Sequence, residues 1–396
     1  MSHRLNHWLL VVAHVLCGSF GLDVAHAQSP RAAATAIATT RLHARIEPRP
    51  SDTWLFGRIQ DLTVDGSGRV YVLDATDQKV RVFSASGAPL RVIGGRGRGP
   101  GELFRPRTIE VVNDTLWVID NANARLSAFS LSSGAYLRTS RAAVYDQNIE
   151  AVSQAGIFLV DAAGPENPSP SNPLTRRVIH ERRVKQDRRH IASASDTRRS
   201  LVFRLYAGAA KQPFATANTT QPLDNGPLMR ALPRGRSFFI LHRTPPTNMR
   251  LLEIGWNGDT LRSHTITVPT RTLSTADVAA IVDSLAHPNA IINGVTPVGV
   301  EREIRDSLYV PAQWPAVTEF FAGIDGSVWL RQPQPPGKTA MFWRRTPDGR
   351  DAAPVAVPSG LRPFRVSLTR VWGVAENALG EPVVEVHDVV APPVRR

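Results

Sequence analysis

The chain has 396 residues, of which 42% are hydrophobic, so it is long enough to bury a large core. It carries a formal net charge of +13, which favours anionic over cationic partners. Cys17 is the only cysteine, and this excludes a disulfide within the chain.

The first 27 residues have the pattern of a secretory signal. Arg4 supplies a positive charge near the start, and Trp8–Leu16 is apolar but too short to anchor a protein in a bilayer. Ala25-His26-Ala27 is a small-x-small cleavage site. We therefore expect an exported protein, periplasmic or extracellular, after cleavage of the signal near Ala27.

Cys17 leaves an alternative, in which an acylated cysteine becomes the first residue of a lipoprotein. The residue before such a cysteine is normally small, and here it is Leu16, so we prefer the cleaved signal. No later segment is apolar for long enough to cross a membrane as a helix. We expect residues 28–396 to form a single domain that is a monomer and has no transmembrane segment.

Residues 54–139 contain one pattern twice, and each copy consists of four short strands separated by turns. The strands are expected at Ile59–Val64, Arg69–Asp74, Lys79–Phe83 and Leu90–Gly94, and then at Thr108–Val112, Thr115–Asp120, Arg125–Phe129 and Ala135–Thr139. A four-stranded unit that repeats at this spacing predicts the blades of a β-propeller. The second strand of each copy is almost wholly apolar, which is typical of a strand covered on both faces.

The rest of the chain predicts four more blades. Three of them are expected at Ile149–Ser153, Gly156–Asp161, Arg176–Val184 and Arg188–Ala192; at Leu228–Leu232, Ser237–His242, Met249–Trp256 and Thr260–Val268; and at Val317–Ala322, Ser327–Arg331, Ala340–Arg345 and Ala352–Val357. The last blade has three strands, Phe364–Leu368, Arg370–Ala375 and Pro382–Val389, and Ala36–Ile46 can supply its fourth. Such closure joins the two chain ends and leaves no open edge between blades.

Ser274–Ala286 is predicted to be a helix inserted between blades four and five. Ser274 can cap its start, Asp277 follows three residues later, and apolar residues recur at helical spacing until Pro288 ends it. The sequence thus predicts an all-β fold. It is a six-bladed β-propeller with four-stranded blades and one short helical insertion at about residues 274–286.

The junction between the first two blades resembles a known repeat. The residues that carry the resemblance are Gly99-Pro100-Gly101-Glu102-Leu103-Phe104 and Pro106, followed by Leu116–Asp120, Asn123, Arg125 and Phe129. They are similar to the NHL-type repeat and to bacterial TolB-like propellers with a Gly-Pro-Gly-Glu-Phe-x-x-Pro junction, although two residues, Leu103-Phe104, stand where one aromatic is usual. The resemblance implies a six-bladed architecture that serves exported binding modules and also lactonase-type and lyase-type enzymes.

Polar side chains follow the second strands of the first two blades, close to the basic loop Gly94–Pro106. These loops and the junctions between blades share one face of a propeller, where loops commonly bind ligands. The residues expected at this rim are Asp74, Asp77, Arg96, Arg98, Asp120, Asn121 and Asn123. Asp and Asn also close turns through hydrogen bonds to the backbone, which is the structural alternative.

No catalytic residue and no cofactor is predicted. The chain has no Gly-x-Ser-x-Gly elbow and no histidine pair at zinc spacing. We expect a binding or interaction module rather than an enzyme. The alternative is a metal-dependent, lactonase-like hydrolase or lyase with its site in the central channel, and calcium is expected only in that case.

The expected partner is a protein or an anionic component of the envelope, and nucleic acid is not expected for an exported chain. The basic run Arg176–Arg189 is a candidate for attachment to an anionic surface. Its alternative is a solvated outer hairpin, because runs of charge usually face water.

Overall fold

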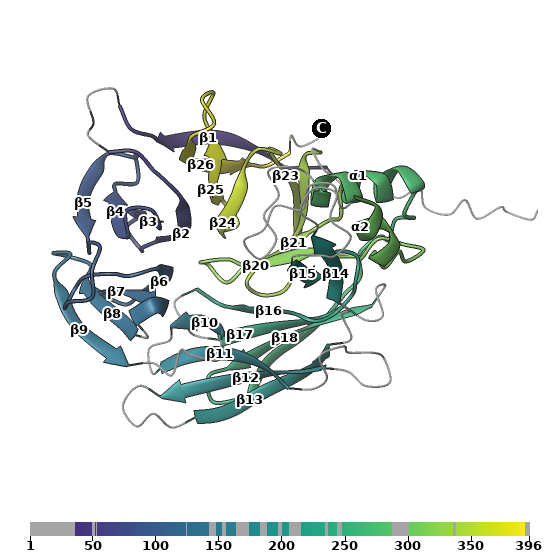
Figure 1. The fold of residues 1–396 in the computed structure, drawn as a ribbon, viewed down its shortest axis with the longest axis horizontal. Coiled ribbons are helices and arrows are strands. Elements are labelled where there is room, and N and C mark those ends of the chain that lie inside the picture. Colours follow the sequence, from purple (N-terminus) through teal and green to yellow (C-terminus); the bar gives the residue numbers. More distant parts are fainter. Residues whose placement is uncertain are drawn as a thin grey trace, which may run out of the picture. The chain divides into compact units, whose positions relative to one another are not determined.

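Apolar runs that are bounded by turn residues become strands throughout the protein. The computed structural model describes residues 36–49, 52, 54–123, 125–141, 148–152, 156–163, 174–182, 188–196, 200–205, 215–233, 237–243, 248–286, 301–335 and 338–392. The predicted signal peptide, residues 1–27, therefore lies outside the described residues. Within these ranges, the unit Ala36–Arg396 contains six antiparallel sheets of four strands and one sheet of two strands (Figure 1).

The first two sheets match the two copies of the sequence pattern. Blade one contains β2 (Ile59–Val64), β3 (Val70–Asp74), β4 (Lys79–Phe83) and β5 (Pro89–Ile93), and blade two contains β6 (Pro106–Val112), β7 (Thr115–Asp120), β8 (Arg125–Ser130) and β9 (Tyr136–Arg141). Every residue of β3 is buried, as expected for an apolar strand covered on both faces. Asp65 shapes the preceding turn by accepting the N–H groups of Ser67 and Arg69 at 2.8 and 3.0 Å.

The next three sheets also fall at the predicted positions. They contain β10 (Asn148–Val152), β11 (Gly156–Ala163), β12 (Leu174–Arg182) and β13 (Arg188–Asp196); β16 (Leu228–Ala231), β17 (Ser237–His242), β18 (Met249–Gly255) and β19 (Thr260–Ile266); and β20 (Glu319–Ala322), β21 (Val328–Arg331), β22 (Ala340–Arg345) and β23 (Asp351–Val357). The predicted strands are confirmed in each of these blades, and the observed boundaries differ from the predicted ones by a few residues.

The last sheet joins the two ends of the described chain. It contains β24 (Arg362–Val366), β25 (Arg370–Glu376), β26 (Pro382–Val390) and β1 (Thr39–Ile46). β1 pairs with β26 in antiparallel register, from Thr39 opposite Val390 to Ile46 opposite Val384. The predicted closure of blade six by the N-terminal strand is therefore confirmed.

The six sheets are arranged as a closed ring. Their first strands contact one another in the order β2, β6, β10, β16, β20 and β24, and β24 returns to β2 (Figure 1). Apolar side chains fill the space between neighbouring sheets, as with the cluster that joins Tyr71 and Leu73 of β3 to Ile109, Leu116 and Val118 of blade two. The predicted six-bladed propeller with four-stranded blades is confirmed.

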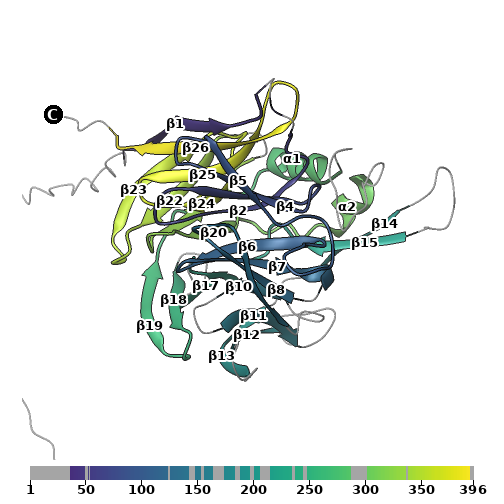
Figure 2. The same ribbon diagram turned by 90° about the vertical axis from the view of Figure 1, so that its left-hand side faces the viewer.

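The insertion is larger than the single helix that the sequence predicted. Besides α1 (Thr275–Ala286), the insertion between blades four and five contains α2 (Glu301–Ser307), and a separate hairpin of β14 (Ser200–Leu205) and β15 (Ala215–Thr220) lies between blades three and four. The hairpin and both helices lie on the same side of the sheets in Figure 2. α2 was missed because its seven residues bury only Ile304, which leaves no apolar repeat to detect. β15 was missed because its sequence, ATANTT, contains no large apolar residue.

The start of α1 has the predicted cap. Asp277 N–H donates to Ser274 Oγ at 3.1 Å, and Ser274 N–H donates to Asp277 Oδ2 at 3.0 Å. These bonds hold the pKa of Asp277 below its ordinary value, although partial burial opposes them. No helix among the described residues has the length and hydropathy needed to span a membrane.

Candidate functional site

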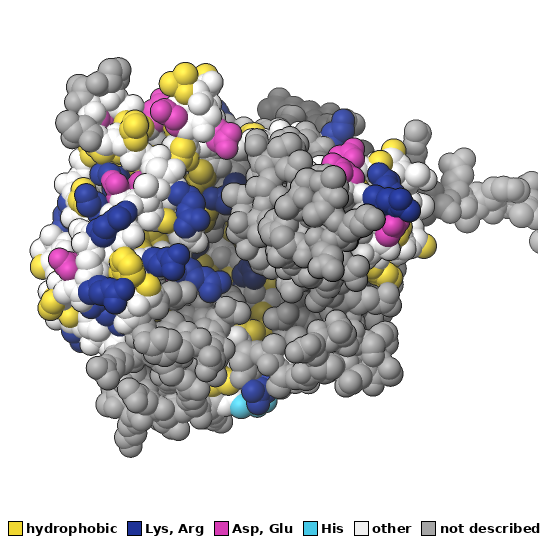
Figure 3. Space-filling view, in the orientation of Figure 1, with side chains coloured by type: hydrophobic (Ala, Val, Ile, Leu, Met, Phe, Trp, Pro, Cys, Tyr) yellow, Lys and Arg dark blue, Asp and Glu magenta, His cyan; other side chains and the backbone are white. Residues whose placement is uncertain are grey.

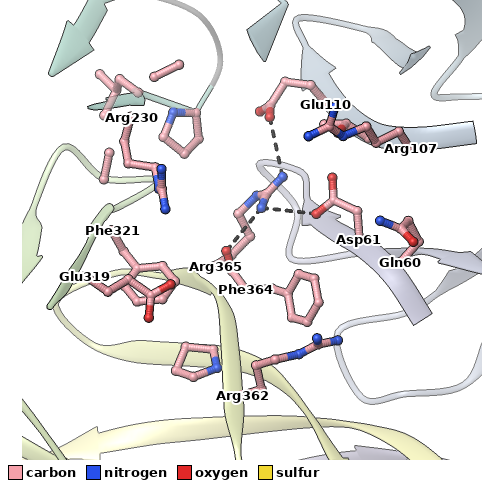
Figure 4. A pocket seen from close by; sticks show the side chains of 16 residues that line it. Gln60, Asp61, Arg107, Glu110, Arg230, Glu319, Phe321, Arg362, Phe364 and Arg365 are labelled. Carbon is pink, nitrogen blue, oxygen red and sulfur yellow. Dashed lines mark hydrogen bonds and ion pairs between the residues drawn. The ribbon is translucent and has the colours of Figure 1, made fainter. Parts of the chain in front are cut away.

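A cavity of about 410 Å³ lies among the first strands of five blades. Its walls come from β2, β6, β16, β20 and β24, and their charged and aromatic members are Asp61, Arg107, Glu110, Arg230, Glu319, Phe321, Arg362, Phe364 and Arg365 (Figure 4). Cavities of this size hold small molecules, and a mixed polar and apolar lining is typical of such sites. The cavity is therefore the candidate functional site.

Arg365 connects three blades at the wall of the cavity. Its guanidinium extends from β24, and Nη1 lies 3.4 Å from Asp61 Oδ1 on β2. Nη2 lies 3.5 Å from Glu110 Oε2 and 3.3 Å from the carbonyl oxygen of Ile109, both on β6. Figure 4 shows the guanidinium between the two carboxylates. Because these bonds cross between blades, they fix the shape of this side of the cavity.

Burial and ion pairing shift the pKa values of Asp61 and Arg365 in opposite directions. Burial raises the pKa of Asp61, and Arg365 together with the N–H groups of Ile109 and Leu62 offsets part of that shift. For Arg365, burial disfavours the charged form, but attraction to Asp61 and Glu110 outweighs it and raises the pKa. Arg365 therefore remains a cation inside the wall.

The cavity does not match the donor set that calcium needs. Calcium takes six to eight oxygen ligands, usually with several carboxylates among them. Two of the carboxylates of the lining, Asp61 and Glu110, already face Arg365, whose positive charge would repel a divalent ion placed between them. Across the described part of the chain there is no group of three or more His, Cys, Asp or Glu side chains placed to hold a metal.

Two other arginines of the lining have different surroundings. Nη1 of Arg230 donates to the carbonyl of Met229 at 2.8 Å, and Nη2 of Arg362 donates to the carbonyl of Ile59 at 3.4 Å. The Arg362 guanidinium also lies 4.6 Å from the ring centroid of Phe364. Both arginines are exposed, and with respect to the residues that the structure describes neither pairs with a carboxylate.

The predicted rim residues Asp74 and Asp120 occupy equivalent places at the ends of β3 and β7, where both are fully buried. Asp74 accepts the N–H groups of Gly57 and Thr76 at 3.1 and 2.9 Å. Asp120 accepts the N–H of Phe104 at 3.0 Å, and burial raises its pKa despite that bond. Each carboxylate thus hydrogen-bonds to the backbone just before the first strand of its own blade. This agrees with the structural alternative, in which Asp closes turns through backbone hydrogen bonds.

Two further rim residues, Asp77 and Arg96, have their partners at or beside the turn between β3 and β4. Asp77 forms an ion pair with Arg81 of β4. Arg96 comes from the loop between blades one and two, and its Nη2 donates to the carbonyl of Thr76 at 3.0 Å. The structure therefore brings this loop and this turn together, as the shared-face argument expects.

The remaining rim residues lie beside the same loop. Arg98 is exposed, and its guanidinium lies 4.6 Å from the ring centroid of Phe104. Asn123 ends the short helix η1 (Asn121–Asn123), and its Nδ2 donates to the carbonyl of Gly97 at 3.3 Å. The side chain of Asn121 lies outside the described residues. The rim stays a prediction, and the described lining of the cavity includes none of its members.

Sequence reasoning missed the arginines of the cavity. Their signal is positional, because Arg107, Arg230 and Arg362 each lie on the first strand of a blade, which is the strand nearest the centre. Basic side chains also recur over the visible face of β2–β9 (Figure 3). The two ends of the predicted attachment run, Arg176–Arg189, fall on β12 and β13, and residues 183–187 and most of its side chains lie outside the described ones.

Comparisons with known proteins agree with the architecture. A family model described as a 6-bladed β-propeller, DUF5128, matches residues 49–163, which hold blades one and two and the start of blade three. No curated protein sequence matches the chain. A solved member of the DUF4221 family from Bacteroides vulgatus is 10% identical, with a TM-score of 0.52 over 90% of this chain and 99% of that one.

Two further solved structures are similar at lower TM-scores. A protein from Bacteroides fragilis that is described as exported is 11% identical, with a TM-score of 0.42 over 88% of this chain and 95% of that one. A catalytically inactive virginiamycin B lyase from Staphylococcus aureus is 11% identical, with a TM-score of 0.37 over 85% and 82%. At such identities the likeness concerns fold alone. The family match and the closed ring of sheets identify the protein as a six-bladed β-propeller.

Proposed function

We propose that the protein is an exported binding module whose ligand occupies the central cavity. The observation that carries the proposal is a cavity of about 410 Å³ with walls from five blades and with charged groups directed into it. Each wall belongs to a paired sheet, and Arg365 links three of them, so the site is rigid before any ligand arrives. Preformed sites of this kind lose little entropy on binding.

The test is a binding screen on the mature protein, taken from the periplasm or medium, whose first residue is expected to be Gln28. Anionic, neutral and cationic small molecules are screened by thermal shift, and hits are titrated by calorimetry. Phe364 lines the cavity with a half-buried ring, so Phe364→Ala should weaken a true cavity ligand by about tenfold through lost contact area. Leu379→Ala is the matched control, because Leu379 is 82% exposed in the turn between β25 and β26.

Three results would contradict the proposal. If Phe364→Ala leaves the affinity of a hit unchanged, that ligand binds outside the cavity. Saturable turnover of a hit, or stoichiometric metal retained through purification, favours the hydrolase or lyase alternative. Full-length protein retained in the cytoplasm contradicts export.

A further inference from the structure

We infer that the ligand is a small organic oxyanion, which carries carboxylate or phosphate groups on a planar apolar body. The inference rests on the proposed function, because it names a ligand class for the same cavity. It comes from three features of the lining: an excess of guanidinium groups, donors of those groups that the protein leaves unused, and flat apolar faces beside them.

The charge balance of the lining favours an anion. It holds four arginines, Arg107, Arg230, Arg362 and Arg365, against three carboxylates. Each carboxylate is already engaged. Asp61 and Glu110 face Arg365, and Glu319 pairs at 3.3 Å with Arg331, which lies outside the lining. The lining therefore carries one positive charge in excess, and neither Arg230 nor Arg362 pairs with one of these carboxylates.

Two of the lining arginines, Arg230 and Arg362, keep most of their donors available. A guanidinium has five N–H groups in a planar fork that fits a carboxylate or a phosphate. Arg230 and Arg362 each use one of them on a backbone carbonyl, and each remains exposed. Arg107 adds a third guanidinium on the opposite side of the cavity from Arg230 (Figure 4), but it interacts within the protein, so we base the inference on Arg230 and Arg362.

The apolar part of the lining indicates the shape of the ligand body. Phe321 and Phe364 contribute half-buried aromatic rings, and Pro233 and Pro363 also line the cavity. The stacking of Arg362 on Phe364 restrains that guanidinium before a ligand arrives, and a flat apolar body can pack against the same rings. A rigid planar anion can therefore contact the guanidinium groups with its charged groups and the aromatic rings with its apolar body.

The test uses calorimetric titration with benzene-1,3,5-tricarboxylate, with its neutral tricarboxamide, and with inorganic pyrophosphate. We expect the tricarboxylate to bind at least about tenfold more tightly than the tricarboxamide, and more tightly than pyrophosphate, which has no planar apolar body. Arg230→Gln and Arg362→Gln should each weaken that binding by about tenfold. Arg302→Gln removes the same charge from a side chain that is 95% exposed on α2, and should change nothing.

Melting curves separate loss of binding from loss of fold. Arg230→Gln should have the same melting temperature as the wild type. Arg362→Lys keeps the positive charge but lacks the planar guanidinium, and it should recover part of the affinity that Arg362→Gln loses. If the tricarboxamide binds as tightly as the anions and Phe364→Ala weakens it, the ligand class is wrong and the proposed function stands. Anion binding that neither glutamine variant weakens, or no anion binding at all, overturns the inference.

Discussion

At the scale of single residues, the same residue type has two roles that local sequence does not separate. Asp74 and Asp120 follow second strands, and that position alone fits either a ligand rim or a closed turn. Their role depends on which way the carboxylate points, and the donor for Asp120 is the N–H of Phe104, sixteen positions earlier. Burial of this kind is a tertiary property, so the sequence could name these residues but not their partners.

Asp120→Asn should destabilise the fold. The carboxylate is fully buried, accepts the N–H of Phe104 and the Nδ2 of Asn123, and lies 3.4 Å from Nε of Arg125. An amide cannot accept all these donors, and an unsatisfied buried partner costs about 1–3 kcal/mol. Urea unfolding measures the effect, and Asp114→Asn in the exposed turn between β6 and β7 is the control. Equal midpoints for Asp120→Asn and wild type would contradict the assigned role.

At the scale of elements, predictions succeeded where a pattern repeats. Each blade shows strands separated by turn residues, and the three strands of blade six required a partner, which β1 supplies. Predictions failed in the insertion, where packing determines structure. α2 buries Ile304 in a cluster with Ile281 and Val282 of α1, and Gln221 fixes the end of α2 by donating to the carbonyl of Ser307 at 2.8 Å. No local periodicity in the sequence predicts such contacts.

The closure between β1 and β26 should depend on pH. Burial alone would raise the pKa of Glu385 on β26, but hydrogen bonds from His387 and from Arg45 of β1 outweigh it and lower the pKa. A lowered folded-state pKa gives stability that is complete above the unfolded value and is lost as pH falls through the folded one. The melting temperature should therefore fall as pH drops below the ordinary pKa of glutamate, about 4.3.

Glu385→Gln tests this expectation, because glutamine does not titrate. The variant should show a shallower acid decline and a small loss near neutral pH, about 0.5–1 kcal/mol, because Arg45 is 42% exposed and the pair is screened. The raised pKa of Asp61 acts in the opposite direction, favouring the folded state at low pH in both proteins. Identical acid profiles for wild type and variant would show that Glu385 does not control the closure.

At the scale of the whole molecule, the fold was predictable and the cavity was not. Blade spacing is a local property, so the count of six could be taken from repeats along the chain. The cavity forms only when the ring closes and brings residues near 61, 107, 230, 319 and 364 to one place. Sequence reasoning named a channel as the alternative site, but could not say which charges would meet there.

An experimental structure of the protein with bound benzene-1,3,5-tricarboxylate tests the binding role of the central cavity most directly. We expect difference density in the central cavity, with carboxylate groups against Arg230 and Arg362 and the ring against Phe364. Density on the loop that carries Arg96 and Arg98, with the cavity holding water alone, would contradict a ligand site in the cavity and would favour the rim that the sequence predicted.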